Sequence, residues 1–220
     1  MKLSEWLENH ITLHTHDNPQ QEFYNFLTHF AGAVLSIIAL ILMIIKSISN
    51  NGNNLAGVVI FGLSMTLLYS ASSVYHRVKH SNLKRILRIM DHSNIYFLIA
   101  GTYTPIALFM NNEAGNRIAI TIWSIAFSGI VFTLVFWGKL KPLHVAIYLF
   151  MGWIAVFFWK DLKQILPFNF IKWTIAGGIT YTIGVIFYAL KKLPFYHPIW
   201  HVFVVGGSAC FFFGVYNFLI

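Results

Sequence analysis

Charged residues are scarce in this chain, and their scarcity excludes an ordinary soluble domain. Asp, Glu, Lys and Arg together make up 10% of the 220 residues, whereas soluble domains carry about 25%. Hydrophobic residues make up 57%, and the mean hydropathy is +0.66. A composition this apolar indicates a protein that is embedded in a membrane.

Cysteine and acidic residues are also rare. The single cysteine, Cys210, lies inside an apolar run, which excludes a disulfide framework and a zinc site built from cysteines. Seven acidic residues face 15 Lys and Arg, and the formal net charge is +8. Because the basic residues lie in short segments between apolar runs, we interpret them as topology signals and contacts for anionic lipid headgroups. We do not interpret them as a nucleic-acid surface.

Long apolar runs are what the sequence has in abundance, and seven of them are about long enough to cross a bilayer as helices. They cover residues 26–46, 55–75, 93–110, 117–138, 142–159, 171–190 and 198–219. The runs are continuous and do not alternate every second residue, which favours helices over a β-barrel. We therefore predict an all-α membrane protein with seven transmembrane helices in residues 26–220.

The distribution of basic residues predicts how the chain is inserted. The N-terminal segment and the loops on the same side of the membrane hold ten of the 15 Lys and Arg. Since cytoplasmic loops carry such an excess, we expect the N-terminus in the cytoplasm and the C-terminus outside. Residues 1–25 then form a cytoplasmic segment in which Leu3, Trp6, Leu7, His10 and Ile11 recur at helical spacing on one face. Either a short amphipathic helix in the membrane interface or a disordered tail fits this segment.

Polar side chains from four distant segments fall at the predicted cytoplasmic ends of the spans. They belong to the first, second, third and seventh spans: Glu22, Asn25, His29, Ser72, His76, Asp91, His197 and His201. Ionisable groups inside a membrane bundle are costly and are functional by default. We interpret their convergence on one level as a functional site.

The spacing of the histidines points to a metal. His197 and His201 are four residues apart, as are Ser72 and His76, so each pair lies on one face of a helix. Three imidazoles from two helices can fill three corners of a tetrahedron and leave the fourth to water, the arrangement of catalytic zinc. Asp91 would then orient or deprotonate that water, or hold a ligand histidine by its second nitrogen. A lone interfacial histidine, by contrast, is usually an amphipathic side chain in the headgroup region.

Four motifs in order along the chain carry a resemblance to a known family. They are ExxNxxTH followed by Gly32, SxxxH on the second span, the aspartate that opens the third span, and HxxxH on the seventh. With these motifs the chain resembles the hemolysin III branch of the progestin and adiponectin receptor family. That family comprises seven-helix membrane proteins, grouped with membrane hydrolases that include alkaline ceramidases. The resemblance covers nearly the whole chain.

The resemblance implies a zinc site near the cytoplasmic side, with three ligands: His76, His197 and His201. It implies that two further residues contact the zinc-bound water or the reacting group: Ser72 and Asp91. Three further residues match a family motif: Glu22, Asn25 and His29. We expect them to cap the first span and to tie it to the site by hydrogen bonds.

Our leading hypothesis is a zinc-dependent hydrolase that cleaves an amide or ester bond of a membrane lipid, as a ceramidase does. One alternative is a non-enzymatic regulator of the membrane, or a receptor, with structural zinc. A lesser alternative is a pore-forming cytolysin, which the clustering of ionisable groups at one end does not favour. The short N-terminal segment fits a bacterial plasma-membrane protein better than a hormone receptor.

Overall fold

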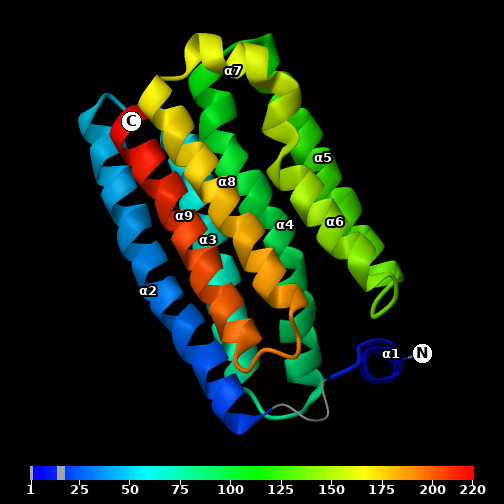
Figure 1. The fold of residues 1–220 in the computed structure, drawn as a ribbon. Helices are drawn as coiled ribbons and strands as arrows, with labels where there is room; N and C mark the ends of the chain where they lie inside the picture. The colour runs from blue at the N-terminus through cyan, green and yellow to red at the C-terminus, as the bar shows by residue number, and fades with distance from the viewer. Residues whose placement is uncertain (1, 14–17) are drawn as a thin grey trace.

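The computed structural model describes residues 2–13 and 18–220, and all regular structure in these ranges is helical (Figure 1). The α-helices are α1 (Leu3–His10), α2 (Pro19–Ser49), α3 (Leu55–Arg77), α4 (Asn82–Met110), α5 (Glu113–Val135), α6 (Lys141–Gly152), α7 (Trp159–Ile165), α8 (Phe168–Ala189) and α9 (Tyr196–Phe218). A 3₁₀ helix, η1 (Ile154–Phe158), joins α6 to α7.

Seven segments in the described ranges are long and apolar enough to cross a membrane. Six are the single helices α2, α3, α4, α5, α8 and α9, and the seventh combines α6, η1 and α7. The predicted all-α architecture with seven spans is therefore confirmed, and the chain is a multi-pass membrane protein. The direction of insertion stays a prediction.

Two helices begin well before the apolar runs that predicted them. The α2 helix begins at Pro19, where the Asn18 side chain accepts a hydrogen bond from the Gln20 N–H at 3.0 Å. The α4 helix begins at Asn82, after the cap Ser81. The predicted boundaries at residues 26 and 93 were therefore too late, because these helices continue through polar turns that face other parts of the protein. Asn18 caps the first span, so the expected capping role of the ExxNxxTH motif was wrong.

The fifth span is broken where α6 ends at Gly152. Tyr103, which projects from α4, stabilises the break through its hydroxyl group. That hydroxyl donates a hydrogen bond to the Gly152 carbonyl at 2.8 Å and accepts one from the Ala155 N–H at 3.1 Å. Backbone groups freed by a break need hydrogen-bond partners inside a bilayer. Here one tyrosine hydroxyl is the partner of both the freed carbonyl and the freed N–H.

The helices form a bundle in which α2 packs on α3, α3 on α4, and α8 on α9 (Figure 1). The start of α2, the end of α3, the start of α4 and the start of α9 lie together at one end of the bundle, the lower end in Figure 1. We call this the N-terminal end. The C-terminus and α7 lie at the opposite end. The four segments that the sequence predicted to converge therefore do so.

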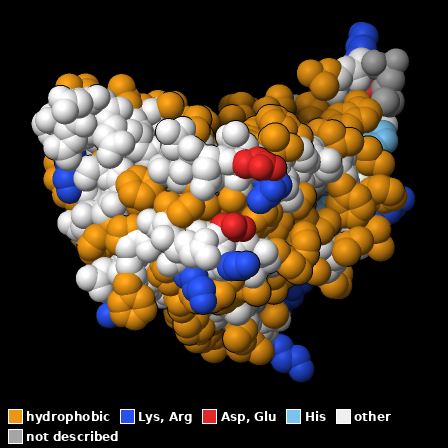
Figure 2. Space-filling view, turned by 90° about the horizontal axis from the view of Figure 1, so that it is seen from above, with side chains coloured by type: hydrophobic (Ala, Val, Ile, Leu, Met, Phe, Trp, Pro, Cys, Tyr) orange, Lys and Arg blue, Asp and Glu red, His pale blue; other side chains and the backbone are white. Residues whose placement is uncertain are grey.

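The outer surface is largely apolar. Along α2, large side chains such as Ile37, Ile41, Ile45 and Ile48 are between 46% and 61% exposed. Seen from the end where α7 lies, hydrophobic side chains cover much of the surface, and several Lys, Arg, Asp and Glu side chains lie on this end face (Figure 2). The apolar surface along the helices matches a lipid environment and would be an aggregation liability in water.

Helices α8 and α9 approach closely at small residues. A Cβ added at Gly207 would lie 2.6 Å from the Tyr181 ring, and one at Gly177 would lie 2.6 Å from the Phe211 ring. At the adjacent Gly206 the nearest atom would be 3.5 Å away, an ordinary contact. Small residues that allow close backbone approach are typical of helix pairs in membranes.

The Gly207→Ala substitution should destabilise the bundle, whereas Gly206→Ala should be nearly neutral. The added methyl group at residue 207 must displace the Tyr181 ring, and overpacking of this kind costs about 1–3 kcal/mol. Thermal unfolding of the two variants in the same detergent measures the difference. Equal unfolding midpoints would show that the α8–α9 contact tolerates the extra volume.

Candidate metal centre

Three histidines meet at the N-terminal end of the bundle, and we call them the histidine triad: His76, His197 and His201. His76 lies in the last turn of α3, while the other two lie in the first turns of α9. Each offers one ring nitrogen to a set in which all atoms lie within 4.8 Å of one another. The ring planes meet at angles of 63° to 89°, so the imidazoles converge edge-on and do not stack.

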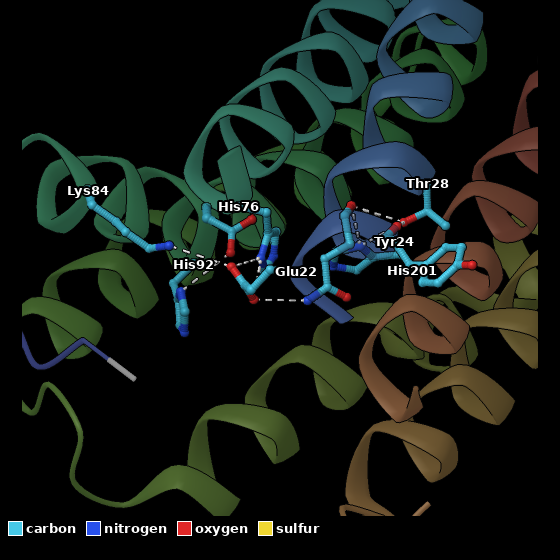
Figure 3. Close-up of polar contacts among 9 residues, drawn as sticks. Glu22, Tyr24, Thr28, His76, Lys84, His92 and His201 are labelled. Carbon is cyan, nitrogen blue, oxygen red and sulfur yellow. Dashed lines mark hydrogen bonds and ion pairs between the residues drawn. The ribbon is translucent and has the colours of Figure 1, made fainter. Parts of the chain in front are cut away.

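Glu22 holds the first ligand candidate by its second nitrogen (Figure 3). The His76 Nδ1 atom lies 3.1 and 3.2 Å from the two carboxylate oxygens of Glu22. A carboxylate only accepts hydrogen bonds, so Nδ1 carries the proton and the Nε2 lone pair is left over. This Nε2 atom is buried and has no hydrogen-bond partner in residues 2–13 and 18–220. A carboxylate behind a ligand histidine is the usual support of a zinc site.

His201 is held in the same way by α2. Its Nδ1 atom lies 3.2 Å from the Asn25 carbonyl oxygen and 3.1 Å from the Thr28 hydroxyl oxygen. The Thr28 hydroxyl donates its own proton to backbone carbonyls one turn back, so it accepts from the imidazole. The Nδ1 atom again carries the proton, which leaves Nε2 to face the triad. The residues present thus fit a metal ion.

Behind Glu22 lies a buried lysine. The Lys84 ammonium is 3.5 Å from the Glu22 carboxylate, and the Asn25 amide donates to that carboxylate at 3.2 Å. The lysine is only 4% exposed. Lys84 is one of the basic residues between apolar runs that the sequence presents as topology signals, so its place in the site was not predicted. The sequence signal was absent, because only the early start of α4 brings this residue inside.

The other predicted site residues lie close by. Ser72 is fully buried one turn before His76, and its hydroxyl oxygen has no hydrogen-bond partner in the described part of the chain. Asp91 lies in the third turn of α4, with its carboxylate 3.8 Å from the His92 ring. His29 is 3% exposed and stacks on His201. The catalytic roles of Ser72 and Asp91 stay predictions.

One cavity joins the histidine triad to Glu22, His29 and Asp91. It has a volume of about 620 Å³ and extends from the N-terminal end into the bundle. The histidine triad, Glu22, His29 and Asp91 line its polar part. Its deeper wall is mostly apolar and includes Leu98, Ile99, Val204 and Phe211. A volume in this range suits a small-molecule or lipid ligand.

The N-terminal segment lies beside the mouth of this cavity. Leu7 and Ile11 are buried, and α1 packs on the start of α4. The Arg85 side chain donates to the Ile11 carbonyl at 3.2 Å, and Arg88 donates to the Thr12 carbonyl. Thr12 itself lines the cavity. Residues 2–13 are therefore fastened to α4. Residues 1 and 14–17 of that predicted segment lie outside the described residues.

Glu22→Gln should weaken metal binding, tested with added zinc, by about 10- to 100-fold, the usual effect of altering the group that supports a ligand histidine. The substitution removes the charge that faces both His76 and Lys84. Competition titration with a chromogenic chelator measures the affinity. Glu113→Gln is the matched control, since Glu113 pairs with Arg117 on the surface at 2.9 Å. Equal affinities of the two variants would show that Glu22 does not support metal binding.

The fold and the triad together define a class: seven-helix membrane proteins with a histidine site that can hold a metal inside the bundle. Within that class, the chain belongs to the haemolysin-III related family, whose model matches residues 18–212. This confirms the resemblance drawn from the motifs.

Two bacterial relatives are similar to the chain over nearly their whole length. The hemolysin-3 homolog of Bacillus subtilis is 43% identical over 199 residues, which cover 89% of this chain and 93% of that protein. The hemolysin-3 of Bacillus cereus is 40% identical over 204 residues, which cover 91% and 93%. The human monocyte to macrophage differentiation factor is 27% identical over 167 residues, which cover 73% and 69%.

Proposed function

We propose that this protein is a zinc-dependent hydrolase that cleaves an amide or ester bond of a membrane lipid. The observation that carries the proposal is that hydrogen bonds on the Nδ1 side orient two of the triad imidazoles. Acceptors on α2 hold the Nδ1 atoms of His76 and His201, which leaves their Nε2 atoms for a metal at the wall of a large cavity. Three imidazole ligands are the donor set of many catalytic zinc sites.

The residues around the triad supply the other parts of a hydrolytic site. When bound, zinc lowers the pKa of a water molecule to about 7 and polarises a carbonyl oxygen. Asp91 would accept a proton from the attacking water and return it to the departing amine or alcohol. The Ser72 hydroxyl would donate a hydrogen bond to the charge that develops on the carbonyl oxygen. The products are a fatty acid and the deacylated lipid.

The shape of the cavity supports a lipid substrate. Its deep apolar wall, formed in part by Leu98, Ile99 and Phe211, suits an acyl chain. The polar groups lie at the N-terminal end of the bundle, where a headgroup linkage would meet them. We infer that this end faces the cytoplasm of a bacterial cell and that the protein is in the plasma membrane. Basic residues near this end, such as Arg77, Lys79 and Lys192, would attract anionic headgroups.

The proposal is tested with zinc-loaded protein in detergent. Fluorescent acyl amides and acyl esters with different headgroups are offered, and released fatty acid is measured by chromatography. We expect zinc-dependent release from at least one of these linkages. Protein that binds one zinc ion but releases no fatty acid from any of them would refute the hydrolase.

A regulator with structural zinc is the second candidate, because the cavity also holds a carboxylate. Asp91 lines the same cavity as the triad but is not in the group whose ligand atoms lie within 4.8 Å of one another, so it would have to move toward the triad to close the site as a fourth ligand. X-ray absorption spectroscopy on the zinc-loaded protein separates the two functions. A site with four protein ligands indicates structural zinc, whereas three histidines and an exchangeable oxygen support catalysis.

A further inference from the structure

His29 is a fourth histidine beside the triad, but its geometry differs from that of the other three. Its ring lies 3.5 Å from the His201 ring, centre to centre, with only 12° between the planes. The triad rings are 4.6 to 5.3 Å apart and steeply inclined to one another. Face-to-face stacking directs the nitrogens of two rings in parallel and not toward one shared point. His29 is therefore outside the ligand set.

Both ring nitrogens of His29 are buried, and neither has a hydrogen-bond partner in the described ranges. The His29 ring also packs against Tyr69, edge to face, with the ring centres 5.2 Å apart. A phenylalanine at residue 29 could make the same two ring contacts. A buried polar atom without a partner is destabilising. The chain thus retains two such atoms at a position where an apolar ring would fit.

A molecule bound in the cavity can supply the missing partners. His29 lines the cavity together with the triad and Asp91, and the helix that carries it also supplies the groups that hold His76 and His201. His29 lies 3.5 Å from the His201 ring, centre to centre, so it is next to any molecule whose reactive bond lies against the triad. A neutral imidazole offers one N–H donor and one acceptor nitrogen, which suits an oxygen of that molecule.

We propose that His29 is a substrate-binding residue that donates a hydrogen bond to the acyl carbonyl oxygen of the lipid. This inference rests on the proposed hydrolase function and adds the residue that recognises the acyl group. The stack on His201 holds the imidazole in a fixed orientation, so the donor is already placed when the acyl group arrives. Lipids without a carbonyl oxygen next to the reactive bond lose this contact.

The test uses binding, without turnover, to protein loaded with cobalt(II), whose visible spectrum reports ligands that reach the metal. Two probes with the same chain are compared: N-hydroxydodecanamide, which carries a carbonyl oxygen, and dodecanethiol, which carries none. His29→Phe keeps a flat ring against His201 but removes both nitrogens. We expect this variant to keep its cobalt and its thiol affinity, while its affinity for the hydroxamate falls about tenfold or more.

His29→Gln is the companion variant, because its amide retains an N–H donor. We expect its hydroxamate affinity to stay closer to that of the unaltered protein than the affinity of His29→Phe does. If His29→Phe does not fold, His29→Leu takes its place in the same comparison. Equal hydroxamate-to-thiol affinity ratios in the unaltered protein and the apolar variant would overturn the proposal. Loss of cobalt from the apolar variant would also overturn it, since His29 would then support the metal.

The same experiment separates this inference from the proposed function. Unaltered protein that binds cobalt but neither probe has no open coordination position, and the hydrolase proposal itself then fails. Unaltered protein that binds both probes with affinities that do not depend on the His29 nitrogens leaves the hydrolase intact and refutes only the role of His29.

Discussion

Replacing His201 by Ala is expected to lower the zinc content of the purified protein from about one ion per chain to near zero. His201 is 1% exposed, and its Nδ1 atom is held by the Asn25 carbonyl and the Thr28 hydroxyl. Its removal leaves two histidines of the triad, from two different helices. Two neutral imidazoles bind zinc far more weakly than three. Hydrolysis of any lipid that the unaltered protein cleaves should be lost as well.

Elemental analysis after size-exclusion chromatography measures this change. His144→Ala is the matched control, because His144 lines the same cavity but lies outside the triad, with its ring 3.3 Å from the Thr133 hydroxyl. The control should retain its zinc. A His201→Ala variant that still elutes with one zinc ion per chain would show that the ion is bound elsewhere.

Under the proposed mechanism, the Asp91→Asn substitution should lower the rate of lipid hydrolysis by about 100- to 10,000-fold, the contribution of a general base, while zinc stays bound. The amide has almost the same shape as the carboxylate but cannot accept the proton of the attacking water. It also keeps an oxygen near the His92 ring, which now lies 3.8 Å from the carboxylate. The initial rate of fatty-acid release, with zinc measured in the same samples, tests this expectation.

Asp161→Asn is the control for this experiment, since Asp161 lies in the first turn of α7 at the opposite end of the bundle. Its activity should be unchanged. If Asp91→Asn keeps most of its activity, another group is the base. If it loses its zinc, Asp91 is a ligand, and the structural-zinc alternative gains support.

The seven spans could be predicted from the sequence because each is a continuous apolar run, and the bilayer sets how long such a run must be. The break in the fifth span could not, since the residues of η1, IAVFF, are apolar like those of a helix. What stabilises the break is the Tyr103 hydroxyl from α4. A contact between two spans leaves no trace in the hydropathy of either one.

The triad was predictable for a similar reason. Four-residue spacing puts His197 and His201 on one face of a helix, and the topology brings the SxxxH motif to the same end of the bundle. The pairing of Glu22 with Lys84 was not predictable, because Lys84 lies in a basic stretch that reads as a loop. The stacking of His29 on His201 could not be predicted from the sequence either. It depends on the rotation of α2 against α9, which spacing within one helix does not determine.

The positions of the two chain ends have a practical consequence. The mouth of the cavity lies beside α1. The α9 helix begins at Tyr196 at that end of the bundle and ends at Phe218, close to the C-terminus, at the other end. In sealed vesicles, a C-terminal epitope that added protease removes therefore marks molecules whose cavity opens toward the lumen. The fraction cut gives the sidedness of the preparation. Inhibition by a reagent that does not cross the membrane can then be assigned to one population of molecules.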